Sequence, residues 1–124
     1  MILVDSCGWL ELLTDGPLAD DYVRYLTDPA LLVPTIVVLE VQRVLRREGA
    51  DIAEKHFASW VAAHDVVPLD LETAYLAAEL GVKHRLPLAD AVVYATAVLR
   101  TALVVTSDPH FAALPGVELL PHGQ

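Results

Sequence analysis

The sequence is poor in cysteine, in long apolar runs and in basic residues, and each scarcity excludes a class of protein. Cys7 is the only cysteine, so no disulfide can form within the chain, which is typical of a reducing compartment. No apolar run reaches the roughly 18 residues of a membrane helix, because proline or charged residues interrupt each candidate. No basic segment precedes Ile2, so we expect no secretory signal. These features predict a cytoplasmic protein without a membrane segment.

Basic residues are outnumbered by acidic ones, with eight Lys and Arg against seventeen Asp and Glu and a net charge of −9. An acidic surface repels nucleic acid at long range, which argues against a protein that coats DNA or RNA through a broad basic face. The charge remains compatible with a nuclease that holds one phosphate through bound metal. It also suits a protein that binds a basic partner.

Apolar residues, by contrast, are abundant: 55% of the 124 residues are hydrophobic, which excludes disorder. This length is enough for one domain with a sizeable core and too short for two. The chain shows no internal repeat, no low-complexity segment and no linker. We therefore expect a single domain over residues 1–124.

Short apolar runs alternate along the chain with segments that have helical spacing and helix-start residues. The expected strands are 2–4, 31–33, 66–69, 103–105 and 117–120, and the expected helices are 6–13, 18–26, 36–48, 52–61, 71–80 and 88–99. The expected helix caps are Ser6, Thr35, Asp51 and Asp70, and Gly81 is expected to end the fifth helix. Strands alternating with helices predict a three-layer α/β/α fold around a central parallel sheet.

Two acidic residues follow apolar strands. Asp5 follows the first strand, and Asp108 follows the strand at 103–105. Because ligands of open α/β sheets bind beyond the carboxyl ends of the strands, both acids are candidates for a binding site. Each also has a purely structural interpretation: Asp5 can cap the helix that follows it, and Asp108 before Pro109 can cap a helical turn.

Two further acids interrupt apolar helices. Asp90 is the only charged residue between Leu86 and Leu99, and a buried carboxylate needs a partner, a hydrogen bond or a metal ion. Its structural alternative is the first turn of a helix, where the helix dipole favours an anion. Glu40 lies too far along its helix for that explanation, and its ordinary alternative is a salt bridge to Arg43 or Arg47.

The fold would bring these four acids to one edge of the sheet. Carboxylates so close repel one another strongly unless cations lie between them. Oxygen-only ligands favour Mg²⁺ or Mn²⁺, and no cluster of His or Cys in the sequence indicates zinc. Hard divalent cations in such a cleft typically catalyse phosphoryl chemistry.

Four motifs that contain these acids resemble the motifs of the PIN domain, and the size and start position are most similar to VapC toxins of bacterial VapBC toxin–antitoxin pairs. The motifs are Val4-Asp5-Ser6, Thr35–Val41, Leu86–Ala91 and Thr106–Phe111. The resemblance implies a metal-dependent endoribonuclease that forms a homodimer, binds a VapB-type antitoxin and cleaves RNA. An antitoxin with a basic residue among the carboxylates would neutralise them and block the metal.

Carried over residue by residue, the resemblance implies that Asp5, Glu40, Asp90 and Asp108 are catalytic and hold Mg²⁺, or alternatively Mn²⁺. Asp5, Asp90 and Asp108 are the expected direct metal ligands, with Asp108 acting directly or through water. The sequence departs from the family pattern at Cys7, where a hydroxyl residue is frequent. It departs again at Ser107 and His110, where Asn and Asp are often found.

Several neighbouring residues have both a functional and a structural interpretation. Ser6 can orient a ligand or cap a helix. Arg43 and Arg47 can guide a phosphate, whereas Arg46 and Arg47 can simply complement the helix C-terminus. The run 83–85 can contact RNA or form a solvated loop. The larger aromatic residues, Trp9, Tyr22, Tyr25 and Trp60, have spacings that favour core packing over base stacking.

Three other classes of protein were weighed. A phospho-acceptor receiver domain needs paired acids after the first strand and a Lys near Thr106, and neither is present. A haloacid-dehalogenase-like phosphatase needs Asp-x-Asp after the first strand, but position 7 is Cys. A non-catalytic PIN-like binding module remains as the alternative function, although acids at all four positions argue against it.

Overall fold

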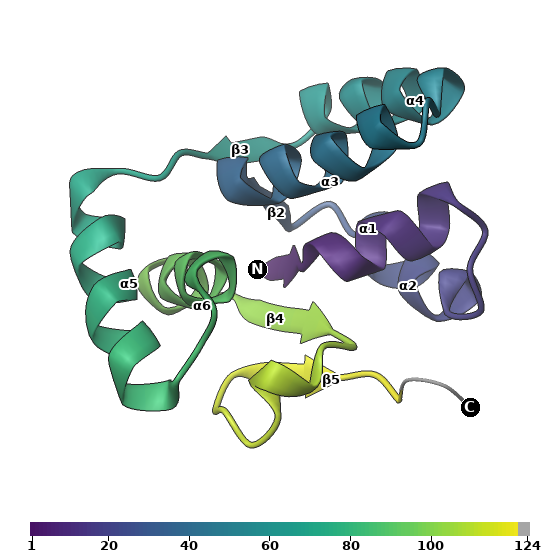
Figure 1. Cartoon of the computed structure of the whole chain (residues 1–124). Helices are drawn as coiled ribbons and strands as arrows, with labels where there is room; N and C mark the ends of the chain where they lie inside the picture. The colour runs from purple at the N-terminus through teal and green to yellow at the C-terminus, as the bar shows by residue number, and fades with distance from the viewer. Residues whose placement is uncertain (122–124) are drawn as a thin grey trace.

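The computed structural model describes residues 1–121, and its centre is a parallel sheet of five strands (Figure 1). The strands are β1 (Ile2–Val4), β2 (Leu31–Pro34), β3 (Asp65–Val67), β4 (Leu103–Thr106) and β5 (Val117–Leu119). Their order across the sheet is β3-β2-β1-β4-β5. Ile2 pairs with Leu31 on one side and with Leu103 on the other, so β1 is the central strand.

Six α-helices flank the sheet within residues 1–121 and complete the predicted three-layer α/β/α fold, which is confirmed. They are α1 (Ser6–Leu13), α2 (Ala19–Leu26), α3 (Thr35–Arg47), α4 (Asp51–Ala62), α5 (Leu71–His84) and α6 (Leu88–Arg100), with a 3₁₀ turn η1 (Pro109–Phe111) before β5. None of these helices has the length and hydropathy to cross a membrane.

The strand order creates a switch point beside β1. The chain adds β2 and then β3 on one side of β1, and returns through α5 and α6 to place β4 on the other side (Figure 1). The connections that leave β1 and β4 therefore diverge, and in open parallel sheets such a point is where ligands bind. Asp5 follows β1 and Asp108 lies two residues beyond β4, so both candidate acids lie at the switch point.

The core is built around aromatic side chains from distant parts of the chain. Trp9 is fully buried and meets the edges of Phe57 and Trp60 at centroid distances of 5.2 and 5.6 Å. Trp60 donates its indole N–H to the carbonyl of Leu26 at 3.0 Å. Tyr22 is also fully buried, which confirms core packing for these aromatics.

The predicted helix caps are correct at one of four positions. Asp70 caps α5 by accepting a hydrogen bond from the Thr73 amide at 2.9 Å. Ser6 is the first residue of α1 and its cap is Asp5. The cap assignments at Thr35 and Asp51 were also wrong: each is the first residue of its helix, and the caps are Pro34 and Ala50. A polar residue at a helix start can occupy either position, and the sequence does not distinguish the two.

The sequence predicted that Gly81 ends α5, and this prediction is wrong. The helix continues to His84 and ends at Arg85, whose φ of 56° is left-handed. Gly81 instead lets α6 approach, since a Cβ at this position would lie 3.1 Å from the Cβ of Ala91. Lys83 and His84 are consequently part of a helix, and only Arg85 belongs to the loop that was expected there.

The third strand also begins earlier than predicted. It covers Asp65–Val67, and Pro68 follows it, because a proline cannot donate a hydrogen bond to the neighbouring strand. β3 is the outermost strand on its side of the sheet.

Gly8 gives the fold a testable packing constraint. A Cβ at Gly8 would lie 2.5 Å from both Val4 Cγ1 and Tyr22 Cε1, closer than real Cβ contacts allow. We expect Gly8→Ala to lower the free energy of unfolding by about 1–3 kcal/mol, as overpacking typically does. Gly81→Ala is the matched control, because its milder crowding is offset by about 1 kcal/mol of helix propensity. Urea unfolding measures both; equal effects of the two variants would contradict this account.

Candidate metal centre

Asp5 is a buried carboxylate at the end of the central strand. It is 2% exposed, although an acid of this kind normally remains in solvent. Its Oδ1 accepts a hydrogen bond from the Ser6 amide at 2.8 Å, and its Oδ2 accepts one from the Thr106 hydroxyl at 3.1 Å. The capping interpretation of Asp5 is therefore correct, but a cap does not require burial of the whole side chain.

Thr106 connects the ends of the neighbouring strands β1 and β4, a role that was not predicted from the sequence. Its side chain is fully buried; its hydroxyl donates to Asp5 Oδ2 and accepts a hydrogen bond from the Asp108 amide at 3.0 Å. The Thr106 hydroxyl thus orients the side chain of Asp5 and fixes the backbone of Asp108. The feature of the sequence that could have indicated this role is the position of Thr106, a polar residue at the end of a buried strand and two positions before Asp108.

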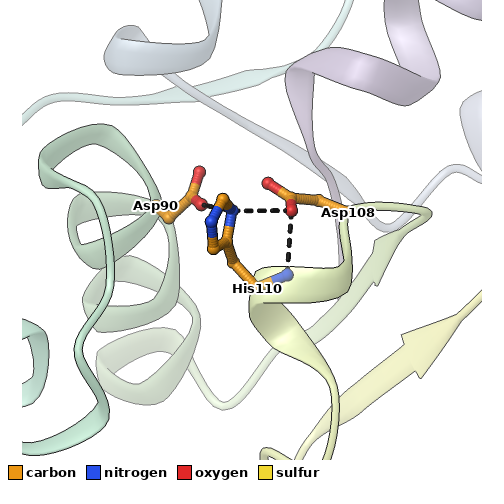
Figure 2. Close-up of side chains that lie close together, drawn as sticks. All are labelled: Asp90, Asp108 and His110. Atoms are coloured by element: carbon orange, nitrogen blue, oxygen red, sulfur yellow. Dashed lines mark hydrogen bonds and ion pairs between the residues drawn. The ribbon is translucent and has the colours of Figure 1, made fainter.

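Asp90, Asp108 and His110 form a compact group (Figure 2). One ligand atom from each lies within 4.8 Å of the others. His110 Nδ1 is 2.9 Å from Asp108 Oδ1 and 3.4 Å from Asp90 Oδ2. Asp90 comes from the first turn of α6, while Asp108 caps η1 by accepting a hydrogen bond from the His110 amide at 2.9 Å. Across residues 1–121 this is the one group of three potential ligands this compact.

Glu40 lies on α3 with one carboxylate oxygen buried and without a partner. This oxygen, Oε1, has no hydrogen bond. The ion pair to Arg43 or Arg47 that would explain Glu40 structurally does not form among the ion pairs of the described residues. A buried acceptor without a partner costs about 1–3 kcal/mol, and an incoming cation or water would satisfy it.

The charges of neighbouring acids add to the raised pKa values of Asp5, Glu40 and Asp90. Burial, followed by the charge of Asp5, raises the pKa of Asp90 to about 8. Burial raises the pKa of Asp5 to about 6 despite its two hydrogen bonds, with smaller contributions from Glu40 and Asp108. The pKa of Glu40 is also raised, first by burial and then by Asp108. The structure thus brings the four predicted acids into one electrostatic unit; their catalytic and metal-binding roles stay a prediction.

A second hydrogen-bond network lies next to Thr106 and connects Tyr22, Ser107 and Cys7. Tyr22 donates its hydroxyl proton to Ser107 Oγ at 3.0 Å, and the Ser107 hydroxyl donates to Cys7 Sγ at 3.5 Å. Burial raises the pKa of Tyr22, so this hydroxyl remains a donor. Cys7 Sγ lies 3.4 Å from Thr106 Oγ1, so Cys7 and Ser107, two of the three departures from the family pattern, form a network next to Thr106.

A groove of about 940 Å³ lies between α3, α5 and α6, and Glu40 is the one of the four acids that lines it. Its lining is mostly apolar and includes Ser6, Glu40, Arg43 and Arg47. The two arginines therefore lie on the wall that also carries Glu40. Arg46, by contrast, pairs with Glu54 at 3.5 Å.

The profile of the PIN domain family matches residues 2–117, nearly all of the chain. The protein therefore belongs to the PIN domain family, as the sequence motifs indicated. A comparison with curated proteins gives no significant sequence match.

Solved structures of toxin–antitoxin proteins share the fold. A toxin–antitoxin complex from Klebsiella pneumoniae superposes with a TM-score of 0.83 at 21% identity, covering 95% of this chain and 96% of the other. VapC20 of Mycobacterium tuberculosis, described as a toxin that cleaves the sarcin–ricin loop, superposes with a TM-score of 0.80 at 20% identity. The match covers 98% of this chain and 100% of VapC20. A DNA-bound VapBC from Salmonella typhimurium superposes with a TM-score of 0.75 at 14% identity, covering 97% of this chain and 98% of the other.

The raised pKa values make the stability of the metal-free protein depend on pH. The folded state binds more protons than the unfolded state between about pH 4 and 8, so stability falls as pH rises through this range. We expect Asp90→Asn to raise the free energy of unfolding at pH 8 by at least about 1.4 kcal/mol, the equivalent of one pKa unit. Urea unfolding in EDTA at pH 5 and 8 measures this. A gain of equal size at both pH values, or the same gain from the exposed-site control Glu79→Gln, would contradict it.

The Thr106 hydroxyl provides a second test of the same network. Thr106→Val keeps the shape but removes the donor to Asp5, and that hydrogen bond is one of the factors that lower the pKa of Asp5. We expect weaker Mn²⁺ binding at pH 7, by about tenfold, since loss of a residue that orients a ligand typically costs 10–100-fold. Thr106→Ser retains the hydroxyl and should bind as the parent does. Calorimetry measures Mn²⁺ binding to both variants. Equal Mn²⁺ affinities of Thr106→Val and Thr106→Ser would contradict the role assigned to the hydroxyl.

Proposed function

We propose that this protein is a metal-dependent endoribonuclease and the toxin of a VapBC-type toxin–antitoxin pair. The observation that carries the proposal is the convergence of Asp5, Glu40, Asp90 and Asp108 at the switch point of the sheet. Burial first, and then the charges of the neighbouring acids, raise the pKa values of Asp5 and Asp90. Such an arrangement costs stability, and a bound cation would offset that cost.

The donor set fits a hard divalent cation. Carboxylate oxygens are the ligands that Mg²⁺ and Mn²⁺ prefer, and Glu40 has a buried oxygen without a partner. Asp5, Asp90 and Asp108 would hold the ion, and Glu40 would bind it or orient water. When bound, the cation supplies a water of lowered pKa and neutralises charge at the phosphoryl group.

The other residues of the site bind and orient the substrate. Arg43 and Arg47 line the groove next to Glu40 and would bind phosphates of the RNA chain, through bidentate hydrogen bonds. Thr106 holds Asp5, and Ser6 at the first position of α1 donates its amide to the same carboxylate. These two groups keep the Asp5 carboxylate fixed before the substrate arrives.

The partners are proposed from the structural neighbours. One neighbour is a toxin–antitoxin complex, two others are VapBC structures bound to DNA, and another is a toxin that cleaves the sarcin–ricin loop. By this likeness we propose a VapB-type antitoxin, an RNA substrate, a homodimer and a cytoplasmic location. The net charge of −9 would favour a basic antitoxin segment.

Cleavage of RNA by the purified protein tests the proposal. We expect hydrolysis with Mg²⁺ or Mn²⁺, none in EDTA, and a loss of at least about 100-fold in Asp5→Asn and Asp90→Asn, as removal of a group that stabilises developing charge typically costs. Asp65→Asn, in an exposed ion pair with Arg100, is the matched control and should cleave normally.

Two results would reject the nuclease assignment. If Asp5→Asn and Asp90→Asn cleaved as fast as the parent, the activity would come from elsewhere. If the parent cleaved no RNA with either ion while binding an antitoxin-like partner, the non-catalytic alternative would be correct.

A further inference from the structure

His110 occupies an unusual position, between two carboxylates from different elements (Figure 2). Its Nδ1 lies 2.9 Å from Asp108 Oδ1 and 3.4 Å from Asp90 Oδ2. The side chain of Asp90 is 12% exposed and that of His110 is 57% exposed. The imidazole therefore stands at the open side of the acid group, where a dissolved ion can reach it.

The backbone holds His110 in this place. The residue lies in the middle of η1, its amide donates to Asp108 Oδ1 at 2.9 Å, and the next residue, Phe111, is fully buried. Phe111 packs edge-on against Tyr94 of α6, the helix that carries Asp90, at a centroid distance of 6.4 Å. The turn that bears His110 is thus anchored to the helix that bears Asp90, which fixes the distance between the two side chains.

A hydrogen bond alone does not account for this arrangement. One N–H of the imidazole can point well at one carboxylate, and Asp108 is the nearer of the two. A hydrogen bond from the imidazole to Asp108 leaves its longer contact of 3.4 Å with Asp90 unexplained. The distances from His110 Nδ1 to the two carboxylate oxygens, 2.9 and 3.4 Å, are distances that two ligand atoms can have on a coordination shell with a radius of about 2.0–2.2 Å.

We propose that His110 Nδ1 is a metal ligand beside Asp90 and Asp108, and that this nitrogen makes the site select first-row transition ions over Mg²⁺. Mg²⁺ prefers oxygen ligands, whereas an imidazole nitrogen strengthens binding of Co²⁺, Ni²⁺ or Zn²⁺. The coordinating nitrogen is unprotonated, so the neutral ring carries its proton on Nε2. The proposal rests on the proposed function only in taking Asp90 and Asp108 as metal ligands. It refines the Mg²⁺ expected from the sequence.

Metal selectivity tests the role of His110 without any activity assay. Calorimetry would measure Co²⁺ and Mg²⁺ binding to the parent, to His110→Asn and to the control His56→Asn, whose exposed histidine lies on α4. We expect His110→Asn to weaken Co²⁺ binding by at least about tenfold and Mg²⁺ binding by less than about twofold, because only the nitrogen donor is exchanged for an oxygen donor. His56→Asn should resemble the parent.

A spectroscopic measurement gives a second, independent result. With Mn²⁺ bound, pulsed electron paramagnetic resonance should detect coupling to an imidazole ¹⁴N in the parent and in His56→Asn. The coupling should be lost in His110→Asn and in His110→Ala. Circular dichroism of each variant establishes that it is folded.

The outcomes separate this inference from the proposed function. If His110→Asn weakens or strengthens both ions equally, or if the ¹⁴N coupling survives in it, His110 is not a ligand and the inference fails. If in that case Asp90→Asn still abolishes binding, the acid site of the proposed function stands. If the parent binds none of these ions, both are rejected.

Discussion

The feature on which the rest of the structure depends is the repulsion among carboxylates that the fold places side by side. A folded protein can tolerate one buried acid with good hydrogen bonds, as Asp5 has with Ser6 and Thr106. It tolerates a second and third nearby only at the cost of raised pKa values, as Asp5 and Asp90 have here. The remaining scaffold, from the Thr106 hydroxyl to the anchored turn at Phe111, holds these groups close although they repel.

The fold and the acids were predictable from the sequence because their signals are local and consistent. Apolar triplets such as Ile2-Leu3-Val4, followed at once by an acid, mark a strand and its end together. The alternation of such strands with helices then determines a parallel sheet. Glu40 and Asp90 could be recognised because a carboxylate in an apolar helix needs an explanation, and the structure provides no ion pair between Glu40 and Arg43 or Arg47 within the described residues.

The parts that the sequence could not supply depend on contacts between distant elements. In the sequence, Thr106 is only one more residue of a strand. Its hydroxyl can donate to Asp5 only because β1 pairs with β4 in the fold. Gly81 has the pattern of a helix stop, but its role is to let α6 approach α5. His110 was noted as a departure from a family pattern, yet its position between Asp90 and Asp108 depends on how η1 packs on α6.

The position of β1 in the middle of the sheet has a consequence for the order in which the protein is made. β1 pairs with β4, which is synthesised long after it because β2, β3 and all six helices lie between the two strands in the chain. Until β4 docks, Asp5 lacks the Thr106 hydroxyl, and Asp108 has no fixed place. Pairing between such distant segments is slow to form. A nascent chain therefore cannot assemble the acid site until β4 and Asp108 have been translated, and the cell is not exposed to the site before then.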